Sequence, residues 1–262
     1  MNKICIFYIN AFTRDNSIFS GNPAAVCVLP EFLSDELMLA IAGQNNLAET
    51  AFIVAKDNNF LIRWFAPKEE VTLCGHGTLA AAHVVFNYLK PELNKIIFQS
   101  PLHTLQAERS DDFITLDFPT RAIEKIKVFP ELKNTVTADI EDVFVSPDDY
   151  YVVLKNQHEI ENIAVDLHAM RLLDKCGVVF TAKGDTVDFV SRVFNPKLGI
   201  DEDPVTGSAH CLLAPYWSQI LKKQNLHALQ LSERCGELFC ELQNDRVLLK
   251  GRCQLYLKGE IF

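Results

Sequence analysis

The chain has 262 residues, 48% of them hydrophobic, which is enough to bury one large core or two modest ones. It carries 34 acidic and 25 basic residues, giving a formal charge of -9, and no cluster of Lys or Arg reverses that balance locally. The charge argues against a nucleic acid or an anionic membrane surface as partner, because both would be repelled.

The N-terminal segment MNKICIFYINAF predicts a first strand and not a signal peptide, since its apolar residues alternate and no small-residue cleavage site follows. No apolar stretch approaches the roughly 18 residues that span a bilayer. We therefore expect a cytoplasmic protein whose eight cysteines are reduced thiols. Cys235 and Cys240 have no second Cys/His pair at zinc-finger spacing, so strand thiols are the expectation there and no metal site is predicted.

The first half of the chain predicts short strands and two helices. The expected strands lie near 3–9, 23–29, 50–56, 59–66, 95–100, 102–109 and 112–118. An amphipathic helix is expected from the N-cap Ser34 to about Gln44. The second helix, from Gly77 to about Tyr88, has almost no polar face and must therefore be buried.

The second half predicts the same kinds of element. A second apolar helix follows Gly207 and runs to about Leu221, and Pro215 is expected to kink it or to lie close to a turn. The expected strands lie near 143–148, 150–155, 177–182, 186–194, 228–232, 235–242 and 246–258.

An internal repeat links the two halves. The pattern R-x-F-x-P-K occurs at 63–68 and again at 192–197, almost half the chain apart, and a glycine that opens an apolar helix follows each copy. The repeat predicts an α/β (α+β) fold of two pseudo-symmetric domains, 1–119 and 120–262, each a mixed, strongly curved sheet wrapped around a central apolar helix. The strand from Gln254 to the C-terminus could belong to either half.

Three segments carry polar residues where apolar or turn residues would be expected. The first contains Glu49, a carboxylate between Leu47 and the apolar pair Ala51 and Phe52. Partial desolvation there would raise its pKa toward the range useful for proton transfer. A solvated Glu at a strand edge is the alternative.

The second segment, CGHGT at 74–78, directly precedes a buried helix. Its glycines allow close approach of a ligand, and the free N–H groups of the helix offer an anion site. His76 could shuttle a proton and Cys74 could act as nucleophile or base, but a turn histidine and a core cysteine are the simpler interpretations.

The third segment places three acids, at 201–203, before the turn Thr206-Gly207-Ser208. Complementing the helix dipole is one interpretation of these acids. The repeat makes this turn equivalent to 75–78, so the two helix N-termini could face each other and hold a small carboxylate between them.

Six motifs in chain order resemble those of the PhzF-like phenazine-biosynthesis family: the segments 10–13, 19–26, 46–52, 63–65, 74–78 and 203–209. The resemblance implies a diaminopimelate-epimerase-like fold, in which each domain wraps strands around a central helix. It also implies a homodimer.

The resemblance assigns roles to individual residues. Glu49 matches the acid/base that moves a proton between carbons of a dihydroaromatic acid without a cofactor, and His76 and Asp203 match its helpers. The residues matched to substrate binding are those of the loop and of the two turns: Gly21, Asn22, Gly75, Gly77, Thr206, Gly207 and Ser208. Asn10 stands where the family usually has Asp, and Ala48 where it usually has Ser, so the substrate stays open.

Two alternatives remain beside this isomerase. A racemase or epimerase of the same fold needs two thiols, one on each side of the substrate. Cys74 is at one of these positions, but Val205 is at the other. The nearest thiol, Cys211, lies one turn inside an apolar helix and should pack in the core. A catalytically idle binding protein would have no need of the Glu, His and Asp together.

The sequence has no Gly-rich dinucleotide fingerprint, P-loop or G-x-S-x-G motif, so no nucleotide cofactor and no hydrolase chemistry are expected. The expected ligand is a small carboxylic acid whose own conjugation stabilises the carbanion.

Overall fold

The structure, a computed structural model, describes residues 3–14, 17, 19–57 and 59–262. The chain divides into two compact units, Met1–Phe118 with Leu248–Phe262, and Pro119–Val247. The expected second range, 120–262, differs from the second unit chiefly at its end, because the residues from Leu248 onward group with the first unit.

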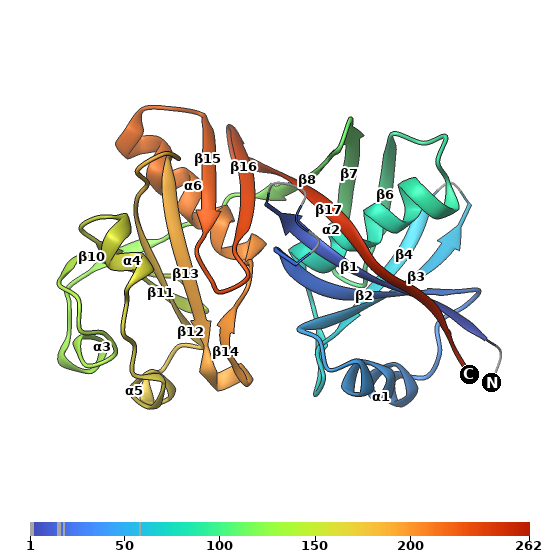
Figure 1. Ribbon diagram of the computed structural model, residues 1–262, viewed down its shortest axis with the longest axis horizontal. Coiled ribbons are helices and arrows are strands. Elements are labelled where there is room, and N and C mark those ends of the chain that lie inside the picture. Colours follow the sequence, from blue (N-terminus) through green and yellow to red (C-terminus); the bar gives the residue numbers. More distant parts are fainter. Residues whose placement is uncertain (1–2, 15–16, 18, 58) are drawn as a thin grey trace. The chain divides into compact units, whose positions relative to one another are not determined.

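The first unit contains the strands β1 (Ile4–Thr13), β2 (Asn22–Leu29), β3 (Glu49–Lys56), β4 (Asn59–Phe65), β5 (Glu70–Val71), β6 (Lys95–Gln99), β7 (Thr104–Ser110), β8 (Phe113–Pro119) and most of β17 (Arg246–Ile261). Pairing runs β1–β2–β3–β4–β6–β7–β8–β17 and returns to β1, so the sheet closes on itself. Because Ile4 pairs with Ile261, the first and last described strands lie side by side (Figure 1).

The helix α2 (Gly75–Val84) packs against β1, β2 and β3. Apart from Gly75 and His83 it is buried throughout, as its apolar sequence predicts. It begins two residues earlier than expected and continues beyond Val84 as a π-helical turn, Val85–Leu89. The other helix of this unit, α1 (Asp35–Asn45), starts as expected after Ser34, whose side chain accepts a hydrogen bond from the Leu37 N–H.

The second unit contains a mixed sheet of β9 (Glu124–Ile126), β10 (Ile140–Val145), β11 (Asp149–Leu154), β12 (Gly177–Lys183), β13 (Phe189–Asn195), β14 (Ile200–Asp203), β15 (Asn225–Gln230) and β16 (Gly236–Gln243). β11 pairs with β12, and β13 with β15, in parallel. The pairs β9–β10, β10–β11, β12–β13, β13–β14 and β15–β16 are antiparallel.

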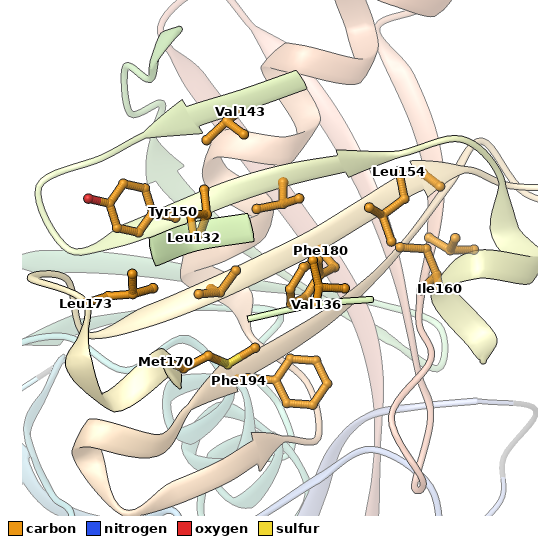
Figure 2. Packing of buried hydrophobic residues seen from close by; sticks show 14 of the residues in the cluster. Leu132, Val136, Val143, Tyr150, Leu154, Ile160, Met170, Leu173, Phe180 and Phe194 are labelled. Carbon is orange, nitrogen blue, oxygen red and sulfur yellow. The ribbon is translucent and has the colours of Figure 1, made fainter. Parts of the chain in front are cut away.

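Three short helices of this unit, α3 (Pro130–Lys133), α4 (Gln157–Glu161) and α5 (Leu167–Leu172), were not expected from the sequence. Their apolar residues, among them Leu132, Ile160 and Met170, join strand residues such as Leu154 and Phe180 in one buried cluster (Figure 2). Each helix is too short to show helical periodicity, which explains why the pattern missed them.

The long helix of the second unit, α6 (Gly207–Leu221), packs on the other face of the sheet. Its Trp217 Nε1 donates to Thr181 Oγ1 on β12, at 2.9 Å, while the neighbouring Phe180 points into the cluster of Figure 2. The helix continues six residues beyond Pro215, which excludes the second of the two expectations for this proline, a turn close to it. Pro215 has no N–H to donate to the Cys211 carbonyl one turn earlier. That carbonyl accepts a hydrogen bond from the Arg121 N–H instead, at 3.4 Å.

The repeated motif forms the same structure in both units. In the first, Arg63 makes a two-bond ion pair with Glu70 and lies 5.1 Å from the centroid of the Phe65 ring. In the second, Arg192 makes the matching pair with Glu202 and lies 5.2 Å from the Phe194 ring. Both pairs join adjacent strands that lead toward the start of the buried helix, as a duplicated unit predicts. Among the described residues, no helix is long and apolar enough to cross a membrane.

Candidate active site

Glu49 is the first residue of β3, and its position follows from the end of α1. Asn46 ends that helix in the left-handed conformation, with φ 51°, which asparagine tolerates better than most residues. The Asn45 side chain ties this turn to the sheet, since it accepts from Tyr8 Oη at 2.9 Å and donates to Thr50 Oγ1 at 3.0 Å. The Glu49 side chain emerges from this turn with 17% of its surface exposed.

The carboxylate of Glu49 lies against the N-terminal turn of α2. Its Oε2 is 3.0 Å from His76 Nε2, and the other ring nitrogen, Nδ1, is 3.7 Å from Cys74 Sγ and 3.4 Å from Asn22 Nδ2. The structure therefore brings four residues of three different motifs together in the first unit.

Glu49 Oε2 and His76 Nε2 are both buried, yet neither makes a hydrogen bond of acceptable geometry with a described residue. Their 3.0 Å separation is an ion-pair distance without hydrogen-bond alignment. Buried polar atoms are almost always hydrogen-bonded in folded proteins. These two atoms are therefore the natural contact points for a ligand.

His76 and Cys74 titrate away from their ordinary ranges. Burial lowers the pKa of His76, but the neighbouring Cys74 and Glu49 outweigh it and leave that pKa raised. Burial raises the pKa of the Cys74 thiol. Beside the carboxylate, this arrangement favours an imidazolium and a neutral thiol.

Cys74 also has a structural role that the sequence did not reveal. It is the N-cap of α2, where its Sγ accepts a hydrogen bond from the Gly77 N–H at 3.2 Å. Gly77 itself has no room for a side chain, because a Cβ there would lie 2.9 Å from Cys74 Sγ and 3.1 Å from Trp64 Cδ1. The indole Nε1 of Trp64 is a further buried donor without a hydrogen-bond partner among the described residues.

Gly21 and Asn22 form the entry to β2. Gly21 has φ 77°, and a Cβ there would lie 2.4 Å from the Ala11 carbonyl oxygen, so only glycine fits. Asn22 is fully buried, and Ala24, two residues on, pairs with Glu49 in the parallel register of β2 and β3. This pairing explains how the loop, the acid and the helix turn meet.

The remaining candidate residues lie in the second unit. Asp203 ends β14 with 8% exposure, and its Oδ2 accepts from Thr206 Oγ1 at 2.5 Å. Gly207 opens α6 as a buried residue, and Ser208 is exposed on the first turn of that helix. The acid and the turn are thus close neighbours in this unit.

Gln230, at the end of β15, organises the same turn and was missed from the sequence. Its Oε1 accepts from the Thr206 N–H at 2.8 Å, and its Nε2 donates to the Asp203 carbonyl at 2.7 Å and to Thr206 Oγ1 at 3.1 Å. Because Thr206 Oγ1 accepts from Gln230, its own hydroxyl proton is available to donate to Asp203 Oδ2. A lone glutamine in an apolar strand carries no motif, so only the tertiary contacts reveal it.

The two thiols weighed for a racemase are both buried. Cys211 has 4% exposure, its Sγ lies 3.6 Å from the Gly207 carbonyl, and burial raises the pKa of its thiol to about 12. The expectation that Cys211 packs in the core is confirmed. All eight cysteines are free thiols.

His210, one turn into α6, leads to a prediction about acid stability. Burial lowers the pKa of its imidazole to about 4, while Nδ1 lies 2.8 Å from the Thr206 carbonyl. Because the unfolded chain binds this proton near pH 6.5 and the folded one only near pH 4, stability should fall as the pH drops through that window. We expect the contribution of His210 alone to lower the free energy of unfolding by about 2 kcal/mol between pH 7 and pH 5.

The measurement is urea unfolding at pH 7 and pH 5 of the wild type and of His210→Gln, whose amide can still donate to Thr206. The variant should lose less stability over this interval than the wild type. His83, whose pKa burial also lowers to about 4, contributes equally in both proteins. Equal losses in the two proteins would contradict the assignment to His210.

Comparison with known proteins agrees with this architecture. The phenazine biosynthesis-like protein family (PhzC-PhzF) matches residues 9–259. A Pseudomonas aeruginosa protein named an uncharacterized isomerase is 44% identical over 243 residues, covering 93% of each chain. A crystal structure of a PhzF-family protein from Enterococcus faecalis superposes with a TM-score of 0.95 at 41% identity, covering 99% of each chain.

A more distant structure extends the similarity of fold alone. A hydroxyproline epimerase from Agrobacterium vitis gives a TM-score of 0.65 at 10% identity and covers 100% of this chain and 91% of its own. The strand-rich α+β fold expected from the sequence, and its likeness to epimerases, are confirmed.

Proposed function

Because the chain belongs to the PhzC-PhzF phenazine biosynthesis-like family, we propose that it is a cofactor-independent isomerase that moves a proton between carbons of a small carboxylic acid. Family membership supports an isomerase- or epimerase-type activity. The choice of proton transfer by Glu49 is our own, and a single observation carries it: the buried Oε2 of Glu49 has no hydrogen-bond partner among the described residues and lies beside an equally unpartnered His76 Nε2.

In the proposed mechanism the Glu49 carboxylate removes a proton from one carbon of the substrate. The proton on Glu49 exchanges with solvent through the exposed part of its side chain, and Glu49 then delivers one proton to another carbon, so that atoms and charge balance over the cycle. His76, whose pKa is raised, would hold Glu49 in place and donate a hydrogen bond to the negative charge that develops on the substrate. The conjugation of a cyclic, dihydroaromatic acid would delocalise the carbanion, which is why no cofactor is required.

We propose further that free N–H groups at the starts of α2 and α6 bind the substrate carboxylate. Gly75 would donate at the start of α2, and Gly207 and Ser208 at the start of α6. Gly77 and Thr206, whose own N–H groups already donate to Cys74 Sγ and Gln230 Oε1, would shape these two turns, with Asp203 as a second helper. Gly21 and Asn22 would line the substrate loop. A cytoplasmic homodimer, without nucleic-acid or membrane partners, is part of the same proposal.

Deuterium incorporation tests the proposed activity even while the substrate is unidentified. The protein is incubated in deuterated water with a panel of conjugated cyclic and open-chain carboxylic acids, and each acid is examined by mass spectrometry. We expect enzyme-dependent gain of one deuteron in at least one cyclic acid. A panel that includes the substrates of related isomerases and shows no exchange would favour the idle binding protein.

Cys74→Ala separates this activity from that of a two-thiol racemase. Val205 is fully buried and cannot exchange a proton, and Cys211 is a core thiol, so the second base of a racemase is missing. We expect Cys74→Ala to retain most activity, with a small loss of stability because α2 loses its N-cap. Cys74→Ser, which keeps a cap acceptor, is the matched control.

Racemase activity on amino acids is the result that would contradict the proposed isomerase. Proline and diaminopimelate are incubated with the protein in deuterated water, and the α-proton signal is followed by NMR. Enzyme-dependent loss of that signal, abolished by Cys74→Ala and kept in Glu49→Gln, would replace the proposed isomerase with thiol chemistry.

A further inference from the structure

The N-terminal turn of α2 and the start of β3 bring three kinds of metal-binding atom together. One carboxylate oxygen of Glu49, the sulfur of Cys74 and one ring nitrogen of His76 all lie within 4.8 Å of one another. We call these three residues the ECH cluster. Cys74 and His76 are each 5% exposed, and Glu49 is the open side of the cluster.

The donor set suits a borderline-soft divalent cation. Thiolate, imidazole and carboxylate are the ligands that Zn²⁺ takes in proteins, at about 2.3 Å from sulfur and about 2.0–2.2 Å from nitrogen or oxygen. Around one such ion the donor atoms stand roughly 3–4 Å apart by that geometry. The 3.0 Å between Glu49 Oε2 and His76 Nε2 is already in this range. The 3.7 Å from Cys74 Sγ runs to the other ring nitrogen, Nδ1, so binding of one ion at Nε2 requires the thiol to move closer to that atom.

The charges balance as well. A dication with one thiolate, one carboxylate and a neutral imidazole is formally neutral, so burial of the complete site carries no net charge. The metal replaces the protons on Cys74 and His76, which pass to solvent. Calcium and magnesium, which prefer six or more oxygen ligands, do not match this set.

Two further observations point to a ligand at this place. Glu49 Oε2 and His76 Nε2 are buried atoms without a hydrogen-bond partner among the described residues, and a cation between them would satisfy both. The neighbours also hold the ligands in place, because the Gly77 N–H donates to Cys74 Sγ and the Asn22 amide lies 3.4 Å from His76 Nδ1.

We propose that the ECH cluster binds Zn²⁺ or a similar ion, such as Co²⁺, with water in the fourth position on the Glu49 side. The bound ion occupies the carboxylate lone pair that would accept the substrate proton, so it inhibits the enzyme. Metal binding is independent of the proposed isomerase activity; only the inhibition rests on that function.

Cobalt spectroscopy tests the binding without an activity assay. Co²⁺ is titrated into the metal-free full-length protein, and the near-ultraviolet charge-transfer band of a thiolate–cobalt bond is recorded, followed by displacement with Zn²⁺. We expect one equivalent to give the band in the wild type, no band in Cys74→Ser, and at least tenfold weaker binding in Glu49→Gln. Circular dichroism verifies that each variant is folded.

Cys235→Ser is the matched control, since it removes a partly exposed thiol outside the ECH cluster. It should keep the band. A band that survives in Cys74→Ser, or a wild type that gives none with excess Co²⁺, overturns the metal site and leaves the isomerase proposal standing.

The inhibition is measured separately by deuterium exchange with the substrate that the acid panel identifies. Equimolar Zn²⁺ should stop exchange in the wild type, while Cys74→Ser should need at least tenfold more Zn²⁺. Undiminished exchange with the cobalt or zinc site filled would show that the bound ion leaves the reacting groups free, and it would overturn the inhibitory role.

Discussion

Glu49→Gln should lower the rate of substrate isomerisation by at least about 100-fold, the size typical of a lost general acid or base. The amide keeps the shape of the side chain, which lies 3.0 Å from His76 through Oε2, but it cannot take up the substrate proton. The measurement is steady-state kinetics with the substrate identified by deuterium exchange. We expect the loss chiefly in kcat, because the substitution removes proton transfer more than binding.

Glu92→Gln is the matched control, since it makes the same chemical change at an exposed residue of the first unit. It should leave kcat unchanged. Turnover by Glu49→Gln within a few-fold of the wild type would remove Glu49 from the proposed mechanism, whatever the control shows.

Leu154→Ala should destabilise the protein by about 2–5 kcal/mol, the range for truncating a buried leucine. Leu154 ends β11 at 1% exposure, inside the cluster that α3, α4 and α5 cover (Figure 2). Removing its side chain costs both hydrophobic transfer energy and a cavity. The measurement is the midpoint of urea unfolding, followed by far-ultraviolet circular dichroism.

Leu172→Ala makes the identical substitution in the same unit at a residue that is 74% exposed. Its free energy of unfolding should change by no more than about 0.5 kcal/mol. Comparable losses in the two variants would contradict the packing of the cluster, because the difference between them isolates burial from the chemistry of leucine.

The candidate site was partly visible in the sequence because its motifs are short and local. Glu49 stands out as an acid entering an apolar strand, and Cys74 and His76 stand out beside two glycines at a helix start. The hydrogen bonds of Gln230 could not be predicted from the sequence, because its partners Asp203 and Thr206 lie more than twenty residues away along the chain. A pattern within one segment cannot report contacts that another segment completes.

Cys74 shows the same limit in a different form. The sequence predicted a packing residue, and the thiol is indeed buried, but it also caps α2 through the Gly77 N–H and contributes to the ECH cluster. Cysteine is not among the usual N-cap residues, so propensity gave no signal for that role.

By itself the sequence determined the strand-rich character of the protein, its two apolar helices and its duplicated motif. Each of these depends on the local periodicity of apolar residues or on a repeated string, and both are legible without a partner segment. The tertiary structure alone decided that β17 closes the first sheet, with Ile261 beside Ile4, and that α3, α4 and α5 cover the second. Such pairings depend on the total apolar area that distant segments bury together, and no single segment records that sum.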